Sequence, residues 1–206
     1  MNFNVDSALC VTRTKSSQAD LLRSFESLDA TQENYDCTIW EAASATAAAP
    51  IYFKRVKFEK HGEKWSDGGI RRNNPINEAL AETQRVDDLK HREIGCLLSL
   101  GCGVSQVESI SPNLASFLKQ SVKMMTDAEE VANVFAQSKE GKAFAKSKRY
   151  FRFSVPQGLQ ELEMDEFGKI EIMRAMTVGY LQKVGSGNEV EACAQSLLDP
   201  DANCRY

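Results

Sequence analysis

An aspartate followed by two glycines is the feature of this sequence best suited to chemistry. Asp67, Gly68 and Gly69 come at the end of an expected strand and shortly before an expected helix. The two glycines let the backbone turn sharply and keep bulky side chains away from the carboxylate. Because Asp-Gly is also a common turn, the motif by itself favours a structural role, and a catalytic role needs support from its surroundings.

Four segments around this motif resemble one family, in the family's order and at compatible spacing. They are LRSF at residues 22–25, IWEAASATAAAPIYF at 39–53, WSDGGIRRNNP at 65–75 and LLSLGCG at 97–103. In patatin-like phospholipases the similar blocks read FRSY, WEAARATSAAPTYF, DGG…NNP and SLGTG, so Cys102 stands where the family has threonine. The resemblance is clear over residues 8–105, continues weakly to residue 180, and is closest in style to fungal members.

The resemblance implies a lipid acyl hydrolase that cleaves phospholipid or acylglycerol esters with a serine–aspartate dyad and needs no metal or cofactor. In the family, a serine in a G-x-S-x-G elbow attacks the ester and a glycine-rich loop stabilises the oxyanion. The aspartate acts as general base without a histidine. Asp67 matches this catalytic aspartate, and Gly68 and Gly69 match its motif partners.

The nucleophile has no counterpart in this sequence. The twelve glycines begin at Gly62 and no two stand four positions apart, which excludes a G-x-S-x-G elbow, and no G-G-G-x-R-G loop is present. Ser44, Ser66 and Ser99 are poor substitutes: they lie in an alanine-rich helix, beside the aspartate and in an apolar strand. We therefore expect an N-terminally truncated fragment that is inactive alone, since losing the nucleophile and the oxyanion donors removes most catalysis.

A non-catalytic module that contacts a lipid surface or another protein is the alternative function. Missing strands would leave a sheet edge exposed to self-association. The basic residues 139–152 are typical of a solvated helix end leading into a strand, with contact to anionic lipid headgroups as the other interpretation. A dinucleotide-binding loop at Gly101 and Gly103 is disfavoured because position 106 is Gln106.

Composition excludes several other classes. A formal net charge of -4 argues against nucleic acid as a partner, and no apolar run approaches the roughly 18 residues that cross a bilayer. The N-terminus lacks the pattern of a secretory signal. Six cysteines without CxxC spacing and two separated histidines indicate reduced thiols and no metal site. We expect a cytoplasmic protein with peripheral membrane contact.

Alternating strands and helices indicate one α/β domain over residues 1–206, an incomplete patatin-like three-layer fold with a largely parallel sheet flanked by helices. A T-x-x-E capping box at Thr38 and Glu41 predicts a helix that Pro50 ends. Asn74-Pro75 and Ser111-Pro112 are further helix starts. The expected strands are residues 8–14, 21–25, 51–58, 94–100 (covered on both faces) and 151–155, and the other helices are 74–85, 111–135, 176–184 and 188–198.

Overall fold

The computed structural model describes residues 6–50, 52–58, 62–86, 89–103, 128–157, 159, 162 and 166–198. Two compact units divide these residues. The first contains the described residues up to Lys90, and the second contains those from His91 onward. The prediction of one domain over the whole chain stays a prediction.

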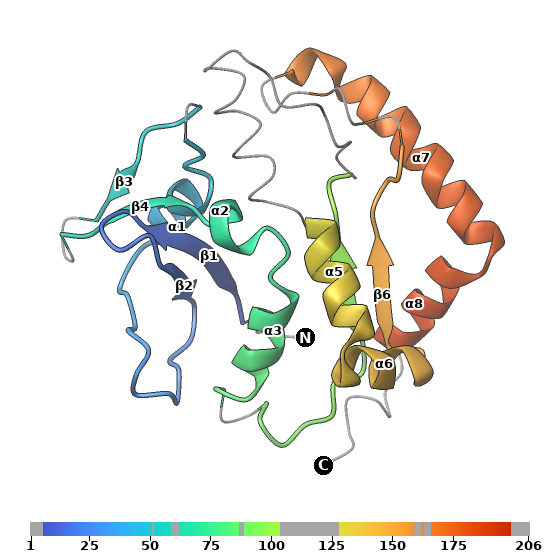
Figure 1. Cartoon of the computed structure of the whole chain (residues 1–206), viewed down its shortest axis with the longest axis horizontal. Coiled ribbons are helices and arrows are strands. Elements are labelled where there is room, and N and C mark those ends of the chain that lie inside the picture. Colours follow the sequence, from blue (N-terminus) through green and yellow to red (C-terminus); the bar gives the residue numbers. More distant parts are fainter. Residues whose placement is uncertain are drawn as a thin grey trace. The chain divides into compact units, whose positions relative to one another are not determined.

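A four-stranded sheet forms the first unit (Figure 1). Its strands are β1 (Ala8–Arg13), β2 (Ala19–Arg23), β3 (Val56–Lys57) and β4 (Lys64–Asp67), arranged in the order β2-β1-β4-β3. Every neighbouring pair is antiparallel. A short turn joins β1 to β2, and Arg13 N–H donates to the Gln18 carbonyl at 2.8 Å across it. This hairpin makes β1 a central strand with β4 on its other side.

Helix α1 (Ile39–Thr46) begins at the expected capping box. Thr38 Oγ1 accepts from the Glu41 N–H, and the Glu41 carboxylate accepts from the Thr38 N–H. The helix ends at Thr46, as expected from Pro50, because the Thr46 carbonyl would need the backbone N–H that proline lacks. Beyond the helix, the Ala48 carbonyl accepts from the Asp67 N–H at 3.0 Å and from Ser66 Oγ at 3.1 Å, which ties this segment to strand β4.

The core of the first unit lies between α1 and the sheet. Trp65 is fully buried, with ring centroids 4.9 Å from Tyr35 and 5.8 Å from Phe58. Small residues on the inner face of α1 let the helix approach the strands closely. The buried cluster consists of Val11, Leu22, Ala42, Ala45, Phe58 and Trp65. The chain around Asp67 is therefore fixed on a packed layer.

Two helices follow β4. The first, α2 (Gly69–Arg72), is a single turn that starts two residues after Asp67, and the second, α3 (Ile76–Thr83), follows it. The expected cap at Asn74 is wrong: the N-cap position is Pro75, and no side chain caps the helix. Asn74 is instead buried, at 4% exposure, within the unit.

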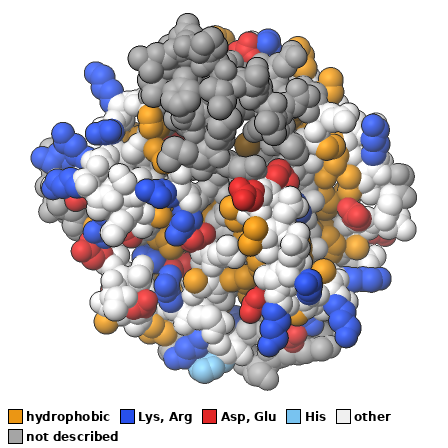
Figure 2. Space-filling model, viewed as in Figure 1, with side chains coloured by type: hydrophobic (Ala, Val, Ile, Leu, Met, Phe, Trp, Pro, Cys, Tyr) orange, Lys and Arg blue, Asp and Glu red, His pale blue; other side chains and the backbone are white. Residues whose placement is uncertain are grey.

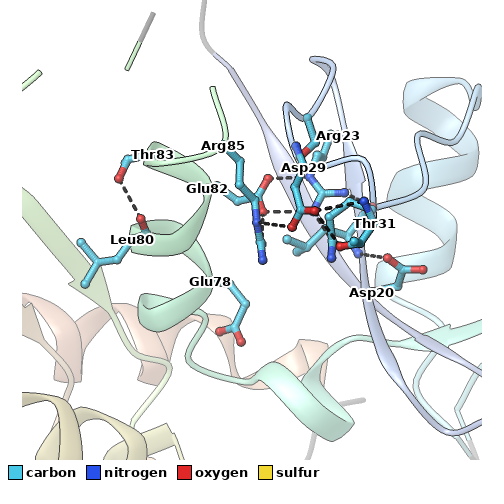
Figure 3. A network of polar contacts seen from close by, with 12 residues as sticks. Asp20, Arg23, Asp29, Thr31, Glu78, Leu80, Glu82, Thr83 and Arg85 are labelled. Atoms are coloured by element: carbon cyan, nitrogen blue, oxygen red, sulfur yellow. Dashed lines mark hydrogen bonds and ion pairs between the residues drawn. The ribbon is translucent and has the colours of Figure 1, made fainter. Parts of the chain in front are cut away.

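A buried ion pair ties α3 to the sheet (Figure 3). Arg23 on β2 donates to both Glu82 carboxylate oxygens, through Nε at 2.5 Å and NH2 at 3.0 Å. Arg85 adds a contact of 2.7 Å to the same carboxylate and pairs with Asp29 at 3.4 Å. The Arg23 side chain is only 2% exposed. Bidentate geometry and burial both strengthen this link.

The second unit contains a parallel strand pair and helices (Figure 1). Strand β5 (Leu97–Leu100) pairs with β6 (Tyr150–Phe153). The helices are α5 (Ala128–Gln137), α6 (Lys139–Lys146), the 3₁₀ turn η1 (Phe167–Lys169), α7 (Ile170–Ser186) and α8 (Glu189–Leu198). Helix α8 is held to the segment before β5, because Ser196 Oγ donates to the Gly95 carbonyl at 2.9 Å.

The mixed α/β class is confirmed, with parallel pairing limited to β5 and β6 among the described residues. The strands expected at residues 8–14 and 21–25 form as β1 and β2. Residues 51–58 are wrong as a continuous strand, since only Val56–Lys57 pairs. Residues 94–100 are wrong as a strand covered on both faces, because Leu100 is 71% exposed beside one described partner strand. The start of the helix expected at 111–135 lies outside the described residues.

Candidate active site around Asp67

Asp67 is the last residue of β4, and its backbone is held by β1 and by the segment that follows α1. It lies opposite Val11 of β1 in the antiparallel register, and Val11 is fully buried. Its N–H donates to the Ala48 carbonyl at 3.0 Å, and its carbonyl accepts from Thr12 Oγ1 at 2.8 Å. These bonds link the end of β4 to the segment after α1 and to β1. The α-carbon that carries the carboxylate therefore has a defined position.

One carboxylate oxygen of Asp67 is oriented by the motif itself. The Gly69 N–H donates to Oδ1 at 2.7 Å, which bends the side chain back over the start of α2. A β-carbon at position 69 would lie 3.1 Å from that oxygen, so a side chain there would crowd it. Glycine at this position keeps the N–H accessible to the carboxylate.

The second oxygen, Oδ2, has no hydrogen-bond partner among the described residues, and no described Lys or Arg pairs with Asp67. The residue is half-buried. An ion pair with a guanidinium would have made the carboxylate part of the scaffold. A carboxylate held at one oxygen and open at the other can accept a proton from a hydroxyl placed against it.

Gly68 explains why the motif needs a second glycine. A β-carbon at position 68 would stand 1.9 Å from the Cys10 carbonyl oxygen and 2.8 Å from the Cys10 β-carbon. That carbonyl also accepts from Thr46 Oγ1 at 2.7 Å, which prevents it from moving away. The Gly68 carbonyl in turn accepts the N–H groups of Arg71 and Arg72, at 3.0 and 2.8 Å. Gly68 therefore lets α2 pack directly on β1.

The three serines near the motif or in apolar elements hold structural positions. Ser66 is buried and donates to the Ala48 carbonyl. Ser99 lies on β5, in the second unit, and accepts from Arg152 NH1 at 3.0 Å. Ser44 lies within α1 and is half-buried. Among the described residues, none of these three serines makes a hydrogen bond with Asp67.

The other sequence expectations concern metals, membranes and thiols. No group of three or more potential metal ligands occurs among the described residues. Within the same residues, the helices are too short or too polar to cross a bilayer. The five described cysteines are all free thiols.

Sequence reasoning missed two features of the site. The first is β1, whose Cys10 and Thr12 contact the motif through backbone and hydroxyl groups that no residue pattern reveals. The second is an open hollow of about 380 Å³ beside α2, lined by Arg71 and Arg72 and by residues of the β1–β2 turn. The two arginines were visible inside the motif, but their position against the turn was not.

A half-buried carboxylate at the end of a strand, held by a glycine N–H at one oxygen and open at the other, has the arrangement that a general base requires. Residues 5–80 match the patatin-like phospholipase family, and this region contains the whole motif. The resemblance seen in the sequence is thereby confirmed for residues 5–80.

A comparison with curated proteins also finds a phospholipase. The chain is similar to Phospholipase A I of Arabidopsis thaliana, with 38% identity over 66 residues. The match covers 32% of this chain and 5% of the relative. The chain therefore corresponds to a small part of that protein.

Proposed function

We propose that this chain carries the general base of a patatin-like lipid acyl hydrolase, with Asp67 as the catalytic aspartate and phospholipid or acylglycerol esters as substrates. The observation that carries the proposal is the hydrogen bonding of the Asp67 carboxylate. Oδ1 accepts from the Gly69 N–H, and Oδ2 has no hydrogen-bond partner among the described residues. The match of residues 5–80 to the family supports it. Gly68 and Gly69 act by shaping the backbone around the carboxylate.

In the proposed reaction, Asp67 takes the proton of a serine hydroxyl as that hydroxyl attacks the acyl carbonyl. The alcohol of the lipid leaves with a proton, and water then releases the fatty acid from the acyl-serine. The base adds typically 10²- to 10⁴-fold to such a step. The sequence contains no elbow glycines, so the serine belongs to polypeptide other than these 206 residues. The chain alone is accordingly inactive.

The first experiment measures hydrolysis of a short-chain nitrophenyl ester by the chain alone. No turnover above buffer is expected. Turnover that disappears in Asp67→Ala would contradict the proposed inactivity and would point to a nucleophile within the chain.

The second experiment tests Asp67 itself. A segment carrying a G-x-S-x-G elbow and a glycine-rich loop from a patatin-family enzyme is fused ahead of residue 6, and ester turnover is measured. Asp67→Asn keeps the size of the side chain and is expected to lower kcat by about 10³-fold. Glu26→Gln, at an exposed position, is the matched control and leaves kcat unchanged. An active fusion that keeps its rate in Asp67→Asn would exclude Asp67 as the base.

A non-catalytic module that contacts a lipid surface is the second candidate, and one observation favours it. The segment formed by η1 and α7 exposes an unusual number of large apolar side chains. Phe167 is 84% exposed and Ile170 57%, and the others are Ile172, Met176, Val178 and Leu181. Binding of the chain to neutral phosphatidylcholine vesicles, lost in Phe167→Ser/Ile170→Ser, would support this candidate.

We also propose a cytoplasmic location, with peripheral membrane contact and self-association through a sheet edge. Five free thiols suit a reducing compartment. Among the described strands, β2 and β3 are the outer members of the four-stranded sheet. An outer strand offers backbone groups to a second chain. Size-exclusion chromatography at two concentrations tests the self-association.

A further inference from the structure

The hollow beside α2 is lined by polar groups of one chemical kind. Four of its residues, Ser16, Ser17, Gln18 and Ala19, come from the turn that joins β1 to β2 and from the start of β2. The other two are Arg71 and Arg72, at the end of α2. The lining thus offers two guanidinium groups, two hydroxyls and an amide, and no carboxylate.

Both walls of the hollow are fixed to the same strand. On one side, Arg13 and Gln18 close the turn with a 2.8 Å backbone hydrogen bond, and Ser17 adopts a φ of 54°, which reverses the chain. On the other side, α2 is anchored by Gly68, which packs against Cys10 of β1. The backbones that carry the two arginines and the two serines are therefore both anchored to β1.

The two arginine side chains differ in the hydrogen bonds and ion pairs that they already make. The exposed Arg71 side chain makes no hydrogen bond or ion pair with the described residues. Arg72 donates to the Arg71 carbonyl at 3.1 Å and also forms an ion pair with Glu78. The Arg71 guanidinium is thus available to a ligand, whereas the Arg72 guanidinium is shared with Glu78. Lys15, next to the turn, contacts Glu63 only at 3.9 Å.

We propose that this hollow binds the oxyanion of a phosphate ester, with Arg71 as the principal ligand and Arg72 and the serine hydroxyls as secondary ones. A guanidinium fork matches a phosphate with two parallel hydrogen bonds, and hydroxyls supply further donors. The volume of about 380 Å³ is within the range of small-molecule sites, roughly 300–1,000 Å³. Figure 2 shows Lys and Arg side chains, with Asp and Glu side chains among them, over the part of the molecule that carries β1 to β4 and α2.

The expected source of the phosphate is a phospholipid headgroup, and this choice rests on the proposed function. Arg71 follows Asp67 by four residues and lies within the single turn of α2, which is about 6 Å long. In a glycerophospholipid the phosphate and an acyl ester occupy neighbouring carbons of glycerol. The same short segment therefore offers one group for the ester and another for the phosphate.

The test measures binding and has no catalytic readout, so its failure is distinct from failure of the proposed hydrolase. The full chain is sedimented with phosphatidylcholine vesicles with or without phosphatidic acid. Binding is expected to be stronger with phosphatidic acid, because its phosphate monoester carries more negative charge and no choline cation. Arg71→Gln is expected to weaken it by about tenfold or more, as for a lost hydrogen bond to a charged group. Glu78→Gln frees Arg72 and strengthens binding by a few-fold.

Arg55→Gln removes the same charge at another exposed position of the same unit and is the matched control. Arg71→Gln weaker than wild type, with Arg55→Gln unchanged, supports the site. An equal loss of vesicle binding in Arg71→Gln and Arg55→Gln, or no vesicle binding by the wild type, would overturn the proposed site. Competition with glycerol 3-phosphate and inorganic phosphate separates the sources: displacement by millimolar amounts of either indicates a site for free phosphates, and resistance indicates a headgroup within a membrane. Both results support an oxyanion-binding site and differ only in the source of the phosphate.

Discussion

Gly68 and Cys10 are in such close contact that a single added carbon atom cannot be accommodated between them. The β-carbon of an alanine at position 68 would lie 1.9 Å from the Cys10 carbonyl oxygen, which Thr46 holds from the other side. This contact joins the loop that carries Asp67 to the central strand β1. The stability of the first unit and the geometry of the candidate site therefore depend on the same glycine.

Gly68→Ala is predicted to destabilise the chain by about 3 kcal/mol, the upper range for overpacking a close contact. The α2 backbone must move away from β1 to make room. Urea unfolding followed by circular dichroism measures the effect. Gly179→Ala is the control, because position 179 lies in α7 with no atom within 4 Å of an added β-carbon. Alanine there is expected to be neutral or slightly stabilising. Similar losses in both variants would contradict the role of the Cys10 contact.

Glu82→Ala is predicted to cost about 3–5 kcal/mol, because it leaves the Arg23 guanidinium buried without its counter-charge. Arg23 is 2% exposed, and Arg85 loses the same partner. The matched control is Glu63→Ala, whose contact with Lys15 is long and exposed, and which is expected to change stability by less than about 1 kcal/mol. Equal unfolding midpoints for the two variants would show that the pair adds nothing.

The Glu82 carboxylate is expected to make the folded chain less stable in acid. Burial alone would raise the pKa of Glu82, but hydrogen bonds from Arg23 and Arg85 outweigh it and lower the pKa below its ordinary value of 4.5. Above pH 4.5 the carboxylate is ionised in the folded and the unfolded chain, and its full contribution is present. As the pH falls toward the folded pKa, the unfolded chain binds the proton first and stability decreases.

The measurement is the urea midpoint between pH 7 and pH 3, for the wild type and for Glu82→Gln. The wild type is expected to lose more stability than the variant over this range, so the two curves converge. Parallel curves would mean that Glu82 is not coupled to Arg23.

The Cys10 thiol is predicted to resist alkylation. Burial, followed by the nearby Glu78 carboxylate, raises the pKa of Cys10 to about 11. At pH 8 about one thiol in a thousand is then ionised, and the thiolate is the reactive form. Iodoacetamide labelling followed by mass spectrometry of peptides is expected to modify the exposed Cys102 first. Labelling of Cys10 at the rate of Cys102 would contradict the buried position of β1. In Gly68→Ala, faster labelling of Cys10 is expected.

The sequence alone pointed to the candidate site. The order of the family-like segments singled out Asp67 as the candidate base, and the match over residues 5–80, which contains three of the four segments, confirms the resemblance. The capping box at Thr38 and Glu41 was predictable because it depends on two residues three positions apart. Strands β1 and β2 were also predictable from their apolar residues. The absence of a G-x-S-x-G elbow is likewise a property of the sequence.

Tertiary structure decided what distant segments do to one another. The segment after α1 is held against strand β4 because Asp67 and Ser66, far along the chain, donate to the Ala48 carbonyl. Gly68 is required because Cys10 lies against it, and no turn rule contains that contact. Arg71 lines a hollow because the β1–β2 turn lies opposite it. Local patterns record the preference of each segment, whereas the partner of a carbonyl or a guanidinium depends on chain packing in three dimensions.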